Sequence, residues 1–448
     1  MEKLDEILRS YTVSSDELTV KNKLLGAGFV VVDRDGAHPL RRRLGSPRLR
    51  ARSSALHHTL PRLASLHDEA AHGRCGAAAC GPGLLAMDQN LRSLEPELAA
   101  MGILRGFDTD DRDGGEEGKP ILEPNTRPIT LHHLLTHTLG LAMDLPVPDL
   151  MRWSRSAGRT AVNLDWTRAG MTTPLSSAPG EGWVYGMAYD WAGSVLEALT
   201  KQSLGEWMQR HIFAPLGMER TGFWPERILG GDEKKAGDDR LLEFAFSAED
   251  GITGARPYPD AELRPGTSIL RTEHEMESGG AGLFSTPHDY GLFLSGLLRS
   301  SSSSSSSSSH HQEQEQETLL KPQTLTQLLT PQLTPPQRAQ LTSTVSAFPA
   351  GFAPEMPLDG SVRLDHGLGG LINLDDLPGK RRRAGSMTWS GMSNGRWWVD
   401  PATGVAAAMF TMVLPHGNDV VNRMWDELER AVYGDLLPGL KQGKGHTV

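Results

Sequence analysis

The spacing of hydrophobic residues predicts a helix at the start of the chain and several more along it. Leu4, Ile7 and Leu8 have helical spacing, which indicates an amphipathic helix over Glu2–Tyr11. Similar patterns recur further on, and one of them opens with a threonine suited to cap its first turn. We therefore expect helices over Thr130–Thr138, Asp190–Leu199, Leu204–Ile212, Asp289–Leu298 and Asn422–Tyr433.

Strand-like segments lie near the two ends of the chain. Gly26–Gly36 is rich in valine and ends in Asp-Gly, which is typical of a strand that enters a hairpin. Near the other end, Gly395–Val399 and Val405–Val413 are strand-like, with the turn residues Asp400–Gly404 between them. A partner strand should follow Gly36 at once, but the hydrophobic pattern stops there, so none is expected.

Residues 37–83 differ in composition from the rest of the chain. These 47 residues contain no valine, isoleucine, phenylalanine, tyrosine, tryptophan, methionine, lysine, asparagine or glutamine. They hold eight arginines, five histidines and both cysteines, and neither a helical nor a strand period runs through them. We expect an irregular segment, which is either a basic insert for an acidic partner or a stretch never selected as protein.

Composition limits the classes of protein that fit. The 448 residues are 38% hydrophobic and 22% charged, enough for a large core, and the formal net charge is −10. This length allows two to four domains or one large two-lobed unit. The absence of a run of about 18 apolar residues argues against a membrane span, and the acidic balance argues against nucleic-acid binding.

The setting of the protein can also be inferred. The N-terminus lacks the apolar core of a secretory signal, and Cys75 and Cys80 are too few for a disulfide framework. A reducing, cytoplasmic location is therefore expected.

The serine run Ser300–Ser309, with the polar residues up to Glu317, is expected to form a flexible insert without a metal site.

Five short segments together resemble one known superfamily. Leu134–Leu141 is similar to the L-L-T-H-T-S-G-L segment of the serine β-lactamase, penicillin-binding-protein and esterase superfamily, with Leu139 in place of the usual serine. Four further segments resemble motifs of the same superfamily and occur in the same order. They are Pro179–Tyr185, Ile212–Thr221, Gly279–Tyr290, and Trp389–Gly391 followed by Asp400-Pro401. The resemblance covers residues 84–435 and is closest to the esterase and transesterase branch, which includes acyltransferases of polyketide pathways.

The resemblance implies a fold and an activity. The fold would be α+β, of the β-lactamase/transpeptidase type, with an antiparallel sheet formed by about residues 1–36 and 340–448 and flanked by helices. A mainly helical lobe would come from about residues 84–300, with 37–83 aberrant and 300–317 inserted. The activity would be serine-dependent acyl transfer on a small ester or thioester, without a cofactor, and an acyl carrier is a further candidate partner.

Particular residues acquire roles from the resemblance. Such enzymes use a serine nucleophile, a lysine base, a tyrosine that relays protons and backbone amides that stabilise the oxyanion. Tyr185 fits the tyrosine, whereas taken alone it is better interpreted as a buried aromatic with a satisfied hydroxyl. Trp389-Ser390-Gly391 fits the strand beside the site, with the Met392 amide as oxyanion donor. The alternative for Trp389 is a core tryptophan before a turn.

Two departures from the superfamily pattern bear on the substrate. Met187 stands where many members have asparagine, which puts one substrate-binding amide in doubt. Trp389 stands where lactamases carry a triplet with lysine or histidine, and it cannot attract the carboxylate of a β-lactam. This change favours neutral esters or thioesters.

Possible metal sites do not match known metal-binding patterns. His132, His133 and His137 have helical spacing, but no glutamate follows the first histidine as in the H-E-x-x-H motif. The resemblance makes His137 structural. The acidic segment Asp108–Glu117 lacks the ligand pattern of a calcium loop. We expect no metal ion.

The nucleophile and its base are missing from the sequence. No S-x-x-K occurs in the 448 residues, and the nearest string, Ser268–Arg271, ends in an arginine that does not deprotonate. The superfamily places this motif between the first strands and the segment after Leu84, which is within residues 37–83.

The genetic code offers an explanation for the missing motif. Read one nucleotide downstream, the codons of Leu66–Ala70 permit Ser-Met-Thr-Lys, and those of Leu63-Ala64 permit a tryptophan three residues earlier. Out-of-frame translation of GC-rich DNA would also explain the skewed composition of residues 37–83. The competing interpretations are a catalytically dead ligand-binding pseudoenzyme of the same fold and a genuine basic insert.

Overall fold

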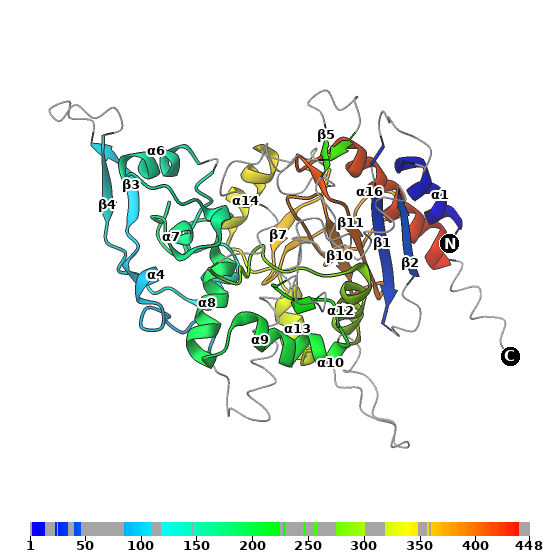
Figure 1. Ribbon diagram of the computed structural model, residues 1–448, viewed down its shortest axis with the longest axis horizontal. Coiled ribbons are helices and arrows are strands. Elements are labelled where there is room, and N and C mark those ends of the chain that lie inside the picture. Colours follow the sequence, from blue (N-terminus) through cyan, green and yellow to red (C-terminus); the bar gives the residue numbers. More distant parts are fainter. Residues whose placement is uncertain are drawn as a thin grey trace, which may run out of the picture.

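The computed structural model describes most of the chain outside the segments with unusual composition (Figure 1). The described residues are 2–13, 23–24, 26–34, 40–45, 85–108, 118–145, 147–224, 227–228, 245–247, 255–257, 275–300, 319–347, 356–357 and 360–438. Residues 300–317, predicted to form a flexible insert, lie outside these ranges except for Ser300.

A seven-stranded antiparallel sheet is formed by segments from both ends of the chain. Its strand order is β2-β1-β11-β10-β9-β8-β7. The strands are β1 (Gly26–Asp33), β2 (Leu40–Gly45), β7 (Leu364–His366), β8 (Leu371–Asn373), β9 (Met387–Ser390), β10 (Arg396–Asp400) and β11 (Val405–Phe410).

Strand β2 corrects the prediction that β1 has no partner and that residues 37–83 are wholly irregular. Leu40–Gly45 pairs antiparallel with β1, with Gly26 opposite Gly45 and Val31 opposite Leu40. A strand ladder is made of backbone hydrogen bonds, and an edge strand tolerates charged side chains, so the arginine-rich sequence did not prevent pairing. Residues 37–39 and 46–83 lie outside the described part of the chain.

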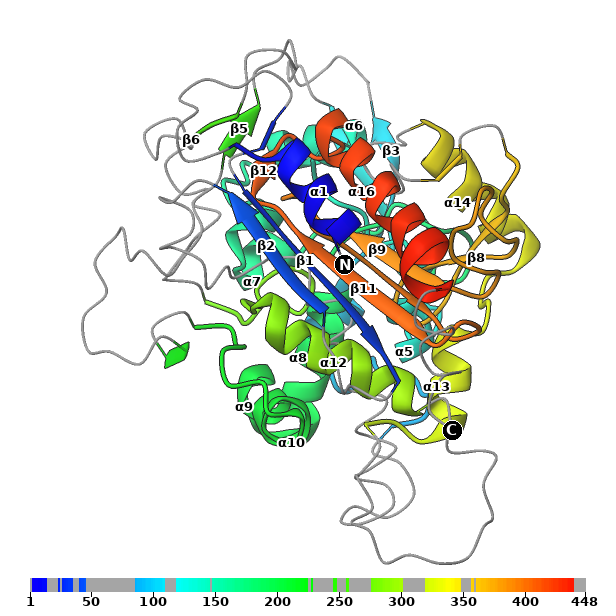
Figure 2. The same cartoon turned by 90° about the vertical axis from the view of Figure 1, so that its right-hand side faces the viewer.

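Alternate residues of β1 pack into two different cores because successive side chains of a strand point to opposite faces of the sheet. Phe29 and Val31 pack with α1 (Glu2–Tyr11) and α16 (Asp419–Ala431). Val30 and Val32 pack with the helices of the middle of the chain. Figure 2 shows α1 and α16 side by side in front of the sheet.

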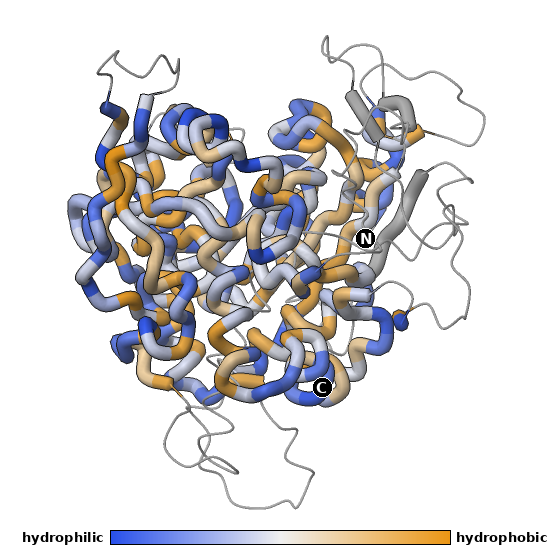
Figure 3. The backbone as a smooth tube through the Cα atoms, turned by 60° about the vertical axis from the view of Figure 1, so that its left-hand side comes forward, coloured by the Kyte–Doolittle hydropathy of each residue, from blue (hydrophilic) through white to orange (hydrophobic). Residues whose placement is uncertain are grey.

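The opposite face of the sheet is covered first by α12 (Pro287–Ser300). A Cβ on Gly291 would lie 2.9 Å from a methyl group of Val30, so glycine lets this helix approach the sheet closely. Beyond it lie α4 (Pro96–Ala100), α5 (Leu131–Leu135), α6 (Pro148–Ser156), α7 (Arg168–Met171), α8 (Ala188–Thr200), α9 (Leu204–Met208), α10 (Ala214–Leu216), α13 (Pro322–Leu329) and α14 (Pro335–Ala347). Figure 3 shows hydrophobic segments gathered towards the interior of this arrangement.

Short strands complete the fold. The hairpin of β3 (Ile103–Asp108) and β4 (Lys119–Glu123) lies far from the main sheet (Figure 1). A third, small sheet joins β12 (Val413–Leu414), β5 (Ala245–Ser247) and β6 (Ala255–Pro257). The predicted strand Val405–Val413 is therefore too long. It ends at Phe410, and Val413 pairs with β5 instead of β1.

The predicted helices are confirmed, α1 over its whole predicted range and the others with changed ends. Thr130 caps α5 as expected, but the helix ends at Leu135 and not at Thr138. His137 adopts φ 57°, and the N–H groups of His137 and Thr138 turn back to the carbonyls of Leu134 (3.3 Å) and His133 (3.0 Å). The predicted Leu204–Ile212 helix is α9 followed by a π-helical turn over Gln209–Phe213. The closing helix begins at Asp419 and continues as a π-helical turn over Val432–Leu436.

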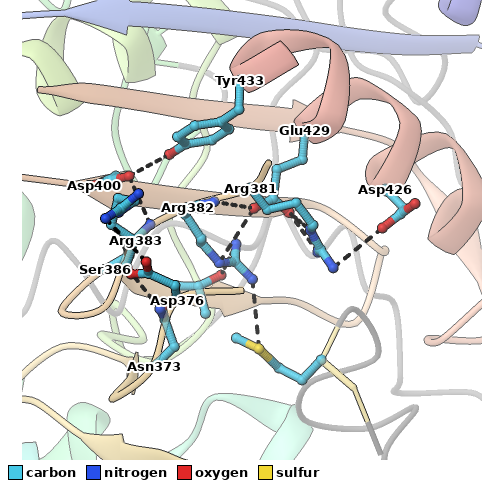
Figure 4. A network of polar contacts seen from close by, with 12 residues as sticks. Asn373, Asp376, Arg381, Arg382, Arg383, Ser386, Asp400, Asp426, Glu429 and Tyr433 are labelled. Carbon is cyan, nitrogen blue, oxygen red and sulfur yellow. Dashed lines mark hydrogen bonds and ion pairs between the residues drawn. The ribbon is translucent and has the colours of Figure 1, made fainter. Parts of the chain in front are cut away.

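A buried polar network joins α16 to the segment between β8 and β9 (Figure 4). Glu429 has no exposed surface and accepts hydrogen bonds from the Arg381 guanidinium (2.6 and 3.0 Å) and the Arg382 amide (3.2 Å). Asp400 accepts from the Tyr433 hydroxyl (2.8 Å) and the Arg383 amide (3.1 Å).

None of the helices in the described ranges is long and apolar enough to cross a membrane.

Candidate active site

Tyr185 lies in the loop that leads into α8, and its backbone is fixed on both sides by the segment after α5. The Val184 N–H donates to the His137 carbonyl (3.0 Å), and the Met143 N–H donates to the Tyr185 carbonyl (3.2 Å). A Cβ on Gly186 would lie 2.1 Å from the Leu141 carbonyl oxygen, so the next residue must be glycine. The chain is thus held closely at the residue predicted to relay protons.

Aromatic side chains from both parts of the fold surround Tyr185. Its ring centroid is 4.9 Å from that of His137 and 5.8 Å from that of Trp389 on β9. His366 on β7 lies 5.7 Å from Trp389 and 5.5 Å from His137. Within the described residues this aromatic cluster has six members: His137, Trp183, Tyr185, Tyr189, His366 and Trp389.

The members of the cluster differ in exposure. Tyr185 is half-buried, whereas His137, Tyr189 and His366 are 1% exposed. The Tyr189 hydroxyl lies 2.7 Å from the Leu135 carbonyl and 2.9 Å from the Leu368 carbonyl, so it is engaged with the backbone. Tyr185 is therefore the phenol of the cluster that solvent or a ligand can reach.

The turn between β9 and β10 carries the other predicted site residues. The Gly391 N–H donates to the Gly395 carbonyl (3.0 Å), and the Asn394 N–H donates to the Gly391 carbonyl (2.8 Å). Met392 occupies the first position inside this turn, with 38% of its surface exposed. Among the described residues, no oxygen accepts a hydrogen bond from the Met392 N–H.

The structure brings some of the predicted residues together and separates others. Tyr185 and Trp389 are neighbours, and Gly391 and Met392 continue from the same strand. The Ser390 hydroxyl instead lies 3.3 Å from Nε2 of His416. Trp389 is only 4% exposed, so it forms part of the cluster's buried side.

Comparisons with known proteins identify the family. Residues 104–429 match the family described as Beta-lactamase. The chain belongs to the beta-lactamase family. Monacolin J acid methylbutanoyltransferase from Aspergillus terreus is 30% identical over 80% of this chain and 78% of its own length. Lovastatin esterase from Penicillium rubens is 31% identical over 82% of this chain and 79% of its own length.

A solved structure extends the likeness to nearly the whole chain. A mutant of simvastatin synthase (LovD) from Aspergillus terreus superposes with a TM-score of 0.75 at 25% identity, covering 98% of this chain and 94% of the other. The predicted α+β fold of the β-lactamase/transpeptidase type is thereby confirmed, as is the predicted superfamily. The named relatives are an acyltransferase and an esterase.

Two buried carboxylates hold the beta-lactamase family motif at Gly279–Tyr290 in place. Asp190 on α8 accepts hydrogen bonds from the Ser278 hydroxyl (2.5 Å) and the Gly280 N–H (3.1 Å). Asp289 accepts from the Arg220 N–H (2.7 Å) and the Thr221 hydroxyl (2.9 Å). The motif segments thus contact one another although they are far apart in the sequence.

The three histidines considered as metal ligands do not share a helical face. His132 and His133 are on α5, but His137 follows the end of that helix and points into the aromatic cluster. Burial, together with the neighbouring His132, lowers the pKa of His133 to about 4. In the described ranges, no three histidine, cysteine, aspartate or glutamate side chains are grouped so that they could hold a metal ion. Most of the acidic segment Asp108–Glu117 lies outside those ranges.

Sequence reasoning missed two members of the cluster. Tyr189 follows Tyr185 by four residues, the spacing of one helical turn, which is a signal that could have been used. His366 lies in Leu-Asp-His-Gly with no comparable signal, because its proximity depends on how β7 and β8 extend the sheet. Leu66–Ala70, whose codons permit the nucleophile motif in the shifted frame, and Ser268–Arg271 both lie outside the described residues.

Proposed function

We propose that this protein derives from a serine acyltransferase or esterase that acts on a small neutral ester or thioester through an acyl-enzyme. The observation that carries the proposal is the half-buried phenol of Tyr185, packed against His137 of the helical part and Trp389 of the sheet. Membership of the beta-lactamase family and relatives that include a methylbutanoyltransferase and an esterase support acyl transfer.

In this reaction a serine oxygen attacks the acyl carbonyl carbon and a lysine takes the serine proton. Tyr185 then passes a proton to the leaving alcohol or thiol as its bond to the acyl carbon breaks, and the lysine returns the serine proton to the Tyr185 oxygen. The Met392 amide donates a hydrogen bond to the oxyanion that forms on the carbonyl oxygen. In the second half of the reaction, water or another alcohol attacks the acyl carbon and gives its proton to Tyr185. The acyl–serine bond breaks, the serine oxygen takes a proton back from the lysine and tyrosine pair, and an acid or a new ester leaves.

The neutral lining beside Tyr185 supports an uncharged acyl substrate. Trp389 offers an indole where a β-lactamase offers a cation, and Gly391 leaves the strand backbone open to an acyl chain. Met187 is 5% exposed and packs in the hydrophobic core, so it does not replace an amide that would bind a polar substrate group.

Because the nucleophile is absent from the printed sequence, two interpretations of the protein have to be compared: an inactive relative and an active enzyme with an error in its sequence. The printed chain has no S-x-x-K, which favours a ligand-binding pseudoenzyme as the literal interpretation. We favour a frame or gene-model error within residues 37–83, since the shifted frame permits Ser-Met-Thr-Lys. Without a nucleophile, binding and oxyanion donors leave only a small residual rate.

The deciding experiment compares two chains. The printed chain should neither hydrolyse p-nitrophenyl butyrate with an acyl-enzyme burst nor react with a fluorophosphonate probe. A chain rebuilt from genomic DNA across codons 30–90, with the shifted frame restored, should do both, and replacing its restored serine by alanine should abolish both. Burst turnover by the printed chain would contradict the assignment of the nucleophile. A restored chain that stays inactive would favour the pseudoenzyme.

A further inference from the structure

The β9–β10 turn depends on one residue in an unusual backbone conformation. Asn394 has φ 64°, in the left-handed region, where asparagine and glycine are the usual residues. It closes a hairpin loop formed by Met392, Ser393 and itself. The first residue of such a loop directs its N–H away from the hairpin's own hydrogen bonds, and that residue is Met392.

The side chain of Asn394 is completely buried and uses all of its hydrogen-bonding capacity. Its Nδ2 donates to the carbonyls of Val413 (2.7 Å) and Pro415 (2.8 Å). Its Oδ1 accepts from the N–H groups of Gly417 (2.8 Å) and Asn418 (3.2 Å). All four partners are backbone groups of the single segment that links β11 to α16.

That segment is itself tied to the C-terminal helix. Asn418 caps α16 by accepting from the N–H groups of Val420 (3.0 Å) and Val421 (3.2 Å). Asn422, one turn into the helix, donates to the Gly417 carbonyl (3.1 Å). The Ser393 carbonyl, next to Asn394, also accepts from the Thr411 hydroxyl (2.9 Å). Asn394 therefore connects the turn to a rigid element on the far face of the sheet.

We propose that Asn394 is a positioning residue that fixes the Met392 amide where the oxyanion forms; this rests on the role proposed above for Met392. An oxyanion donor must lie within about 2.7–3.1 Å of the developing charge, and a displacement of about 1 Å can cost on the order of 10²-fold in rate. Removing the Asn394 amide leaves four backbone groups without their side-chain partner, whereas the Ser393 carbonyl still accepts hydrogen bonds from the Thr411 hydroxyl (2.9 Å) and the Val413 N–H (3.3 Å). The fold of the turn is thus kept while its position is held less firmly.

The structure supplies variants that separate positioning from folding. Asn394→Gly keeps the left-handed backbone and removes all four side-chain hydrogen bonds. Asn394→Asp keeps the two accepted bonds, but it loses the two donated ones and places a buried carboxylate oxygen against the carbonyl oxygens of Val413 and Pro415. The matched control is Asn373→Ala, since Asn373 is also fully buried and donates to the Asp375 and Arg383 carbonyls (both 2.8 Å), on strand β8 away from the turn.

Steady-state kinetics on the frame-restored chain test the effect on catalysis. We expect Asn394→Gly to lower kcat for p-nitrophenyl butyrate by about 10–100-fold with KM within about twofold, and Asn394→Asp to lower kcat at least as much. Asn373→Ala should lower Tm at least as much as Asn394→Gly does, and it should leave kcat nearly unchanged. A normal kcat in Asn394→Gly, or an equal loss in Asn373→Ala, would overturn the inference.

A second measurement uses the printed chain, which has no S-x-x-K motif and is expected to leave an ester intact. With ¹⁵N-methionine labelling, ethyl butyrate should shift the Met392 amide resonance, identified by its loss in Met392→Leu. The shift should persist in Asn373→Ala and disappear in Asn394→Gly. An identical shift in Asn394→Gly, or none in the printed chain, contradicts the inference. If the restored chain is inactive the proposed function fails, while this measurement still decides the role of Asn394.

Discussion

At the scale of single residues, Tyr185 gives the sharpest prediction. In the frame-restored chain, Tyr185→Phe keeps the ring packed against His137 and Trp389 but removes the hydroxyl that we propose transfers protons. We expect kcat to fall by roughly 10²–10⁴-fold with an unchanged Tm. The matched control is Tyr189→Phe, whose hydroxyl contacts backbone carbonyls and should affect stability more than kcat. A near-normal kcat in Tyr185→Phe would make Tyr185 a packing residue.

His133 predicts how stability depends on pH. Burial and His132 lower its pKa to about 4, whereas an unfolded histidine titrates near 6.5. Between these values the unfolded chain takes up a proton that the folded chain does not bind. The free energy of unfolding should therefore decrease as pH falls from about 6.5 to 4.

The variant His133→Gln removes this proton uptake. Its urea midpoint should lose less than that of the unsubstituted chain between pH 7 and pH 5, while the two chains should respond alike above about pH 7.5. If the urea midpoints of the two chains fell in parallel between pH 7 and pH 5, His133 would not be the cause of the acid destabilisation.

Tyr185 and Trp389 were singled out from the sequence because each lies within a motif of recognisable spacing. Asn394 and His366 could not be singled out in the same way. The proposed role of Asn394 depends on hydrogen bonds to a segment some twenty residues later, and the position of His366 depends on how β7 and β8 extend the sheet. A sequence pattern does not contain either distance.

At the scale of elements, periodicity predicted the helices α1, α5, α8, α9, α12 and α16 and missed others, among them α6, α13 and α14. α1 matches its predicted range, because its apolar face and its length are both local properties. α5 is shorter than predicted, because His137 adopts the left-handed conformation that ends a helix. Strand β2 was missed, because its pairing with β1 is made by the backbone and leaves no hydrophobic alternation in the sequence.

The attachment of α16 can be tested through Glu429. It is a fully buried carboxylate paired with Arg381, whose side chain is 4% exposed (Figure 4). Glu429→Gln removes the buried counter-charge of Arg381 and also that of Arg382, whose Nε lies 3.8 Å from the Glu429 carboxylate, and we expect a loss of about 3–5 kcal/mol in the free energy of unfolding. Asp426→Asn, which removes the exposed partner of the same arginine, should cost less than about 1 kcal/mol. Equal losses in urea denaturation would contradict this distinction.

At the scale of the whole molecule, the sheet joins the two ends of the chain, which no local pattern indicates. β1 pairs with β11, so residues near 30 lie beside residues near 408. This long-range pairing was predicted only through the family resemblance. The division into a sheet lobe and a helical lobe, and the cytoplasmic location, stay predictions.

The last prediction concerns residues 46–83 of the printed chain. They have few large apolar side chains beyond leucine, so little offsets a backbone entropy cost of about 1–2 kcal/mol per residue. Limited proteolysis should cleave this region first, at its arginines, and leave a resistant product that begins near Leu84. Strand β2 ends at Gly45, so cleavage beyond it should leave the seven-stranded sheet intact.

Restoring the shifted frame should protect the same region, because it would supply the helix that carries Ser-Met-Thr-Lys. Protease resistance and fluorophosphonate labelling should then appear together in the restored chain. A frame-restored chain with its serine replaced by alanine is the control that separates them, since it should be resistant but unlabelled. If the transcript confirms the printed frame and residues 46–83 already resist proteolysis, the frame error is excluded. The segment is then a genuine insert, and the protein a pseudoenzyme that has exchanged its nucleophile helix for it.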